Sequence, residues 1–144
     1  MKPAVADVVK AKRFEVVDAA GKVQAVFGLG TDGTVGVALV LYDAAGKIRA
    51  TLAMLYGNPV LGLHDAAGKM RATMAVPPDG NPALALYDTA GKGQATMIVG
   101  RDGNPALVLH DAAGKMRATM IVAPDGNPAL VLHDAAGKVI WEAP

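Results

Sequence analysis

Residues 107–129 read LVLHDAAGKMRATMIVAPDGNPA, and this stretch decides the fold because the chain repeats it. Its first turn, DAAGK or DTAGK, occurs six times, at intervals of 25, 22, 23, 23 and 23 residues. A fixed period of this length is typical of repeat architectures. The expected structural turn residues are Asp18, Gly21, Asp43, Gly46, Asp65, Gly68, Asp88, Gly91, Asp111, Gly114, Asp134 and Gly137.

Both turns of the repeat have the residues of a β-hairpin connection. An aspartate at the first position accepts hydrogen bonds from the backbone, and a glycine provides a positive φ. The second turn reads DGNP at residues 79–82, 102–105 and 125–128, and it is degenerate at 56–59. A helix would have to survive glycine and proline at every turn. The pattern therefore predicts about twelve short antiparallel strands, such as residues 115–122 and 127–133.

The composition agrees with an all-β chain and excludes several function classes. Hydrophobic residues make up 52% of the 144 residues and aromatic residues 4%, with 17 glycines and nine prolines between the apolar runs. The net charge of +1 gives no general attraction to nucleic acid or anionic membranes. Without cysteine there are no disulfides and no thiolate chemistry. We find no secretory signal and no apolar run of about 20 residues, so we expect a soluble chain without membrane insertion. The location stays open, with an extracellular or virion fibre as one option.

The apolar runs predict association. Residues 120–122 and 130–132 are apolar at consecutive positions, so both faces of the sheet are expected to lose water. An odd period of 23 residues would send equivalent side chains to opposite faces in successive repeats, unless a bulge or corner corrects it. We take this as evidence against a flat meander. The fold expected is all-β, with tandem β-hairpin repeats in a prism-like or solenoid-like oligomeric stack. A lead-in and capping strand (1–12) would precede a six-copy repeat domain (13–144).

The motifs D-x-x-G-K-x-R-A and D-G-N-P-x-L-x-L, together with RFEVVD at residues 13–18, resemble bacterial hairpin-repeat proteins of unassigned function. The likeness covers nearly the whole chain, and it implies a fold without implying an activity. By architecture, the chain is also similar to the trimeric β-fibre shafts of viruses and phages, in which apolar hairpins from three chains share a core. This second resemblance implies a homotrimer.

Three patterns that could carry chemistry are explained more simply by the repeat. The string GLGTDG at 28–33 fits a dinucleotide-binding motif, but that motif needs a following helix, and 34–42 is expected to be a strand. His64, His110 and His133 share a column in which the other three repeats have valine or tyrosine. One aspartate per turn is not the dense set of oxygens that calcium requires. We therefore expect no cofactor, no metal site and no catalytic residues, and so not an enzyme.

A basic stripe is the remaining candidate site. Lysine recurs at the fifth position of each turn, and arginine follows two residues later in three repeats. Hairpins stacked in register would space these charges about 10 Å apart, and such a stripe could hold a polyanion such as nucleic acid or an acidic polysaccharide. The favoured alternative is that each lysine is neutralised by its own turn aspartate, so no nucleic-acid binding is expected. The candidate polyanion stripe comprises Lys47, Arg49, Lys69, Arg71, Lys92, Lys115 and Arg117.

These observations favour a non-enzymatic structural or assembly protein. It would self-associate through its apolar β-repeats, as a homotrimer, into a fibre, stalk or scaffold. The alternative is a monomeric β-trefoil-like module that binds carbohydrate or a polyanion, because a β-trefoil also has twelve strands. A particle mass that is a multiple of 14.6 kDa would favour the first function, and a single copy the second.

Overall fold

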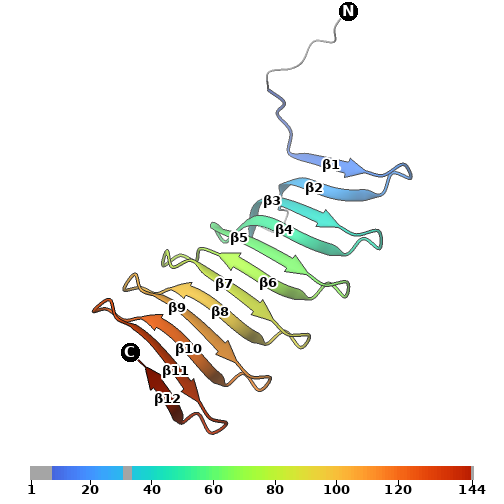
Figure 1. Cartoon of the computed structure of the whole chain (residues 1–144). Coiled ribbons are helices and arrows are strands. Elements are labelled where there is room, and N and C mark those ends of the chain that lie inside the picture. The colour runs from blue at the N-terminus through green and yellow to red at the C-terminus, as the bar shows by residue number, and fades with distance from the viewer. Residues whose placement is uncertain (1–7, 31–33, 144) are drawn as a thin grey trace, which may run out of the picture.

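The structure is a computed structural model that describes residues 8–30 and 34–143 (Figure 1). Within these ranges the chain forms twelve strands and no helix, which confirms the all-β class and the antiparallel pairing. Each strand pairs only with its neighbours in sequence, so all twelve form one sheet in the order β1 to β12. The strands are β1 (Arg13–Val17), β2 (Val23–Leu29), β3 (Val35–Tyr42), β4 (Ile48–Leu55), β5 (Asn58–His64), β6 (Met70–Ala75), β7 (Ala83–Tyr87), β8 (Gly93–Val99), β9 (Pro105–His110), β10 (Met116–Val122), β11 (Pro128–His133) and β12 (Val139–Ala143).

This strand order is a meander that is twisted and not flat (Figure 1), and the bulge that the odd repeat length requires is present in it. The register shifts by one residue next to every DAAGK or DTAGK turn, as a β-bulge does. The extra residue absorbs the odd count, so equivalent residues return to the same face. The residues left without a partner in these bulges are Gln24, Arg49, Arg71, Gln94, Arg117 and Ile140.

The turns are built as their residues predict. In one copy, the Asp111 N–H donates to the Lys115 carbonyl at 2.9 Å, and the Gly114 N–H donates to the Asp111 carbonyl at 2.8 Å. The six glycines of these turns all have φ between 77° and 86°. The degenerate turn between β4 and β5 has only two residues, Tyr56 and Gly57, with φ of 50° and 80°. Positive φ at both central positions is the type I′ geometry that matches the twist of a hairpin.

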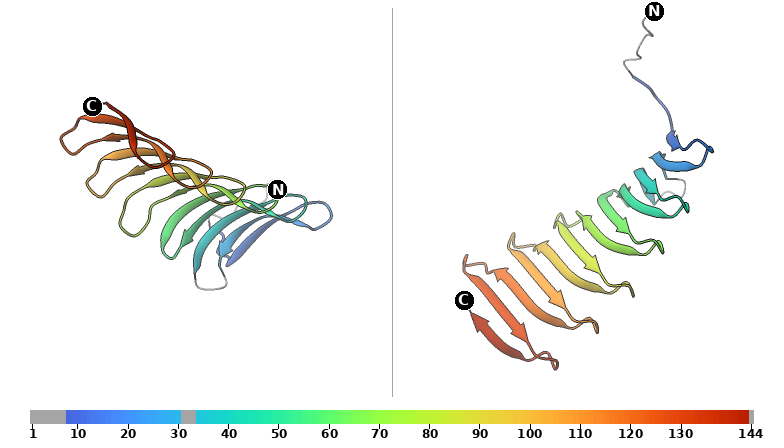
Figure 2. Two further views of the ribbon diagram at one scale, coloured as in Figure 1. Left: turned by 90° about the horizontal axis from the view of Figure 1, so that it is seen from below. Right: turned by 45° about the vertical axis from the view of Figure 1, so that its right-hand side comes forward.

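The sheet is twisted and open, with β1 and β12 at opposite ends (Figure 2). It does not close into the barrel that a β-trefoil requires, which corrects the fold of the alternative prediction. Residues 8–12, where a capping strand was expected, form no strand, and residues 1–7 of that segment lie outside the described ranges. No helix in the described ranges could cross a membrane.

A single sheet has no second layer against which to bury its side chains. Among the described residues, the only buried hydrophobic side chains are those of Val26, Ala38 and Ala53, and no polar or charged side chain is buried. Domains are ordinarily built from two or three packed layers around one core. One copy of this chain supplies only one layer.

Candidate functional site: an uncharged apolar face

The register of the strands sorts the side chains into rows that cross the whole sheet. Directly paired residues share a face, and successive residues along a strand alternate between faces. Within the twelve strands, three adjacent rows on one face contain no charged side chain, and we call this surface the apolar face; Lys12, just before β1, lies at its corner beside Phe14 and Leu29. Its central row consists of Phe14, Phe27, Leu39, Leu52, Leu61, Met74, Leu84, Met97, Leu107, Met120, Leu130 and Ala143.

Two further rows flank the central one. The row nearer the DAAGK turns consists of Val16, Ala25, Leu41, Ala50, Leu63, Ala72, Leu86, Ala95, Leu109, Ala118, Leu132 and Trp141. The row nearer the DGNP turns includes Leu29, Val37, Met54, Pro59, Val99, Pro105, Val122 and Pro128. The apolar face therefore extends from the first strand to the last without a break.

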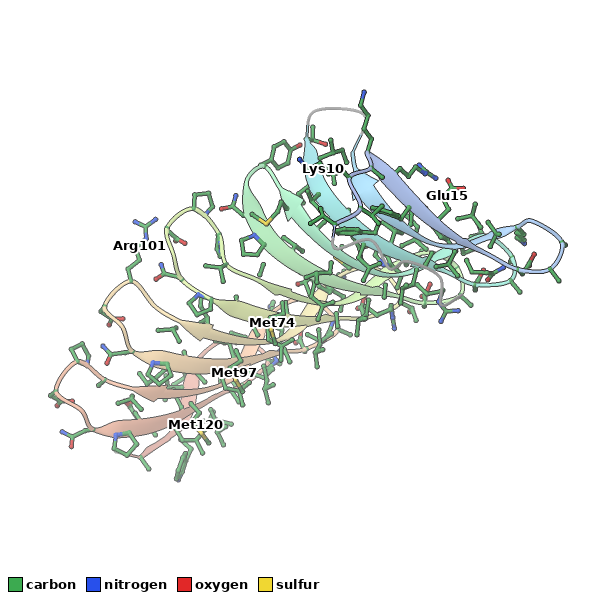
Figure 3. All side chains as sticks on the ribbon, turned by 90° about the horizontal axis from the view of Figure 1, so that it is seen from above. Lys10, Glu15, Met74, Met97, Arg101 and Met120 are labelled. Carbon is green, nitrogen blue, oxygen red and sulfur yellow. The ribbon has the colours of Figure 1, made fainter. Side chains whose placement is uncertain are left out.

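The apolar face is solvent-exposed in the single chain. Met74, Met97 and Met120, from three successive hairpins, lie in a line along it and are each about half exposed (Figure 3). The chain exposes 9818 Å², whereas a compact protein of its mass exposes roughly 6,900 Å², an excess of about 2,900 Å². Apolar patches of more than a few hundred Å² normally mark interaction surfaces.

The opposite face is more polar, and the side chains of its central row are less exposed to solvent. Its central row contains the threonine of each inner repeat, at Thr51, Thr73, Thr96 and Thr119. The consecutive apolar residues in the sequence do not by themselves separate these two faces. The missing information was the position of the bulge, which decides whether threonine in one repeat shares a face with threonine or with methionine in the next.

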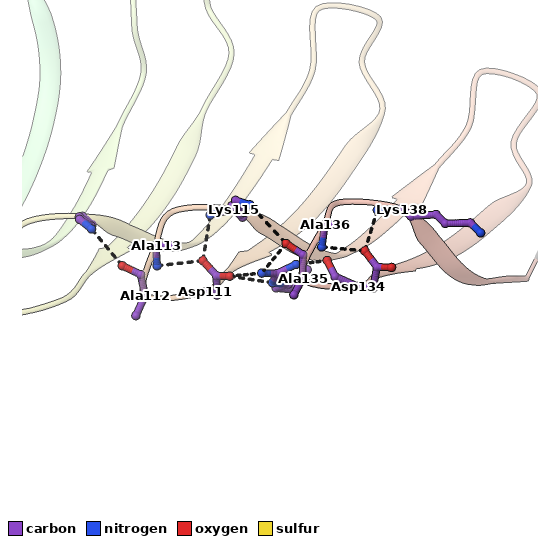
Figure 4. A network of polar contacts seen from close by, with 10 residues as sticks. Asp111, Ala112, Ala113, Lys115, Asp134, Ala135, Ala136 and Lys138 are labelled. Atoms are coloured by element: carbon purple, nitrogen blue, oxygen red, sulfur yellow. Dashed lines mark hydrogen bonds and ion pairs between the residues drawn. The ribbon is translucent and has the colours of Figure 1, made fainter.

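Polar side chains gather at the edge of the sheet formed by the DAAGK turns (Figure 4). Asp111 Oδ1 accepts the backbone N–H groups of Ala113 at 2.9 Å and Lys115 at 3.0 Å. The bond from Lys115 is the main cause that lowers the pKa of Asp111 below its ordinary value. Arg117 forms an ion pair with the Oδ2 atom of the same aspartate and also donates to the Asp134 carbonyl of the next turn.

The lysines of the candidate polyanion stripe connect successive turns. The Nζ atoms of Lys69, Lys92 and Lys115 donate to backbone carbonyls of the next DAAGK or DTAGK turn at 3.1, 3.1 and 3.3 Å. The aspartates are instead paired with arginine in three repeats, as in the 3.4 Å contact between Arg49 and Asp43. The structure thus brings the seven candidate residues to one side of the sheet, where six of them contact groups of the turns themselves.

The three histidines lie on three different strands, β5, β9 and β11. Their Nδ1 atoms are buried and have no hydrogen-bond partner. No group of three metal-binding side chains occurs among the described residues. The histidine positions therefore do not form a common site in this part of the chain.

The string at 28–33 begins within β2 and is followed by β3, so no helix follows it to hold a pyrophosphate. Its last three residues, 31–33, lie outside the described ranges. The segment connects two strands of the repeat.

A scan against protein-family models and a search of curated proteins each found no match to this chain. The candidate function therefore rests on the geometry of the apolar face.

Proposed function

We propose that this chain is a structural protein that assembles with copies of itself through the apolar face, into a stalk, fibre or scaffold. The observation that carries the proposal is a face with no charged side chain within the strands, two of whose three rows cross all twelve strands. Each row is built from the same position in every repeat. If each hairpin bound a different partner, the same face would not stay apolar in every repeat.

The size of the exposed surface supports an obligate assembly. Obligate interfaces bury about 2,000 to 5,000 Å² in total, or about 1,000 Å² and more from each partner. The excess surface of about 2,900 Å² per chain, counted over both faces of the sheet, exceeds the roughly 1,000 Å² that the smallest such interface buries from each partner. Apolar burial is also what a one-layer sheet needs, because at about 25 cal/mol per Å² it is the main favourable term in folding. A prism-like or layered stack would thus form between chains.

The proposal is tested by measuring particle mass with light scattering at micromolar concentration. We expect a multiple of 14.6 kDa for the native sequence. Met97→Lys places a charge in the middle of the apolar face and should shift the particles toward the single-chain mass. The matched control is Thr96→Lys, one residue earlier on β8 but on the opposite face, which should keep the oligomer.

Circular dichroism on both variants shows whether the strands still form. A native chain of 14.6 kDa, or an equal loss of mass in the two variants, would contradict self-assembly through this face.

A further inference from the structure

The apolar face has a regular relief of knobs and hollows. In its central row the even-numbered strands carry the protruding side chains: Phe27, Leu52, Met74, Met97 and Met120 are 49, 55, 53, 55 and 54% exposed. The odd-numbered inner strands carry lower ones. Leu39 and Leu61 are both 39% exposed, and Leu84, Leu107 and Leu130 are half-buried.

Hollows lie over three of the odd-numbered strands, β3, β5 and β7, between successive knobs. A hollow of about 280 Å³ lies over Leu39, between Phe27 and Leu52. A hollow of about 170 Å³ lies over Leu61, between Leu52 and Met74. Another of about 250 Å³ lies over Leu84, between Met74 and Met97. An apolar cavity of about 150 Å³ accepts benzene, so each hollow has room for one leucine or methionine side chain.

The row nearer the DAAGK turns has the opposite phase. There the odd-numbered strands carry leucine and the even-numbered strands carry alanine, over ten consecutive strands from Ala25 to Leu132. Protruding and low side chains therefore alternate along the central row, and leucine and alanine alternate in the opposite phase along the neighbouring row. A surface of this kind fits a copy of itself whenever odd strands lie over even strands.

We infer that two copies pack apolar face to apolar face with their strand orders reversed, β1 of one over β12 of the other. This inference rests on the proposed self-assembly and specifies its geometry. A two-fold axis parallel to the strands, between β6 and β7, produces this overlap and keeps each row over its own counterpart. Because the number of strands is even, every odd strand then lies over an even one.

The contacts that follow are complementary in both rows. Met120 enters the hollow over Leu39 of the second copy, and Met97 enters the hollow over Leu61 of the second copy. In the neighbouring row, Leu86 lies over Ala72 of the second copy. Two sheets packed in this way lie about 10 Å apart, with interdigitated side chains. A parallel arrangement of copies, as in a three-fold shaft, would instead bring equivalent knobs to the same level.

Cross-linking between introduced cysteines tests the arrangement, because the native chain has none. Phe27→Cys on β2 and Leu130→Cys on β11 are nine strands apart in one chain, about 43 Å at the usual strand spacing. In the reversed pair, position 27 of one copy lies over position 130 of the other. A short bismaleimide should therefore convert the double variant to covalent dimers, whereas each single variant should stay uncross-linked.

The possible results separate the geometry from the proposed function. Cross-linking of Phe27→Cys alone would show equivalent strands facing each other and would overturn the reversed arrangement, with self-assembly intact. An oligomeric double variant that does not cross-link would overturn it as well. A particle of 14.6 kDa in light scattering would overturn both the geometry and the self-assembly. Circular dichroism confirms that each variant keeps its strands.

Discussion

Glycine at the fourth position of each DAAGK turn is required by the backbone and not by space. Gly114 has a φ of +81°, and a Cβ atom placed on it would meet nothing within 4 Å apart from the glycine itself and its two chain neighbours. Side chains other than glycine avoid this region because Cβ approaches the neighbouring carbonyl oxygen. The same holds at Gly68 and Gly137, so the repeat uses glycine for a single purpose.

Gly114→Val should therefore destabilise the protein by about 1–2 kcal/mol, the usual cost of a non-glycine residue in the left-handed region. Ala113→Val is the matched control, because Ala113 has no positive φ and its side chain is exposed. Urea unfolding of the two variants measures the difference. Equal free energies of unfolding would contradict the turn geometry.

In each hairpin, the carboxylate of the turn aspartate accepts hydrogen bonds from backbone N–H groups and so stabilises the turn. Backbone N–H groups at the DAAGK or DTAGK turn lower the pKa of Asp65, Asp88 and Asp111 below their ordinary value. The main cause is in each case the hydrogen bond from the lysine four residues later. The charged carboxylate is thus the form that the folded turn favours.

Stability should consequently fall in acid. A carboxyl whose pKa is lowered by folding contributes its stabilisation above the pKa of the unfolded chain, about 3.9. That contribution is lost as the pH falls through the lower pKa of the folded state. We expect the melting temperature to decline below about pH 4.

The triple variant Asp65→Asn, Asp88→Asn and Asp111→Asn keeps an oxygen acceptor for each backbone N–H but cannot titrate. Its melting temperature should depend less on pH than that of the native chain between pH 7 and 2. The same acid dependence in both proteins would show that these turns are not the source.

The sequence was sufficient to predict the hairpins but not the faces of the sheet. Turn residues are local signals, and the strands expected at 115–122 and 127–133 differ from β10 and β11 by one residue at their start. The bulge has no such signal, because its extra residue is arginine, glutamine or isoleucine in different repeats. Its position follows from how the turn joins the strands, and the apolar face cannot be drawn without it.

In the whole molecule each strand contacts only its neighbours, so stability should be distributed over the hairpins. Deletion of residues 107–129 joins Ala106 directly to Leu130, which occupies the position of Leu107 in the next repeat. The shortened chain should have ten strands and an unbroken apolar face. We expect a cooperative melt at a modestly lower temperature and an unchanged number of copies in the particle. Circular dichroism and light scattering measure both, and an unfolded product would contradict an additive sheet.

The bulge in each hairpin also affects how such a chain can evolve. Near-identical repeats in a gene are prone to unequal recombination, which adds or removes whole copies in frame. With a regular pleat and an odd period, every second copy gained in this way would turn its threonines toward the apolar side. Because each repeat contains its own turn and its own bulge, a duplicated repeat places its leucines and methionines on the apolar face. The number of repeats can therefore change during evolution while the apolar face is kept.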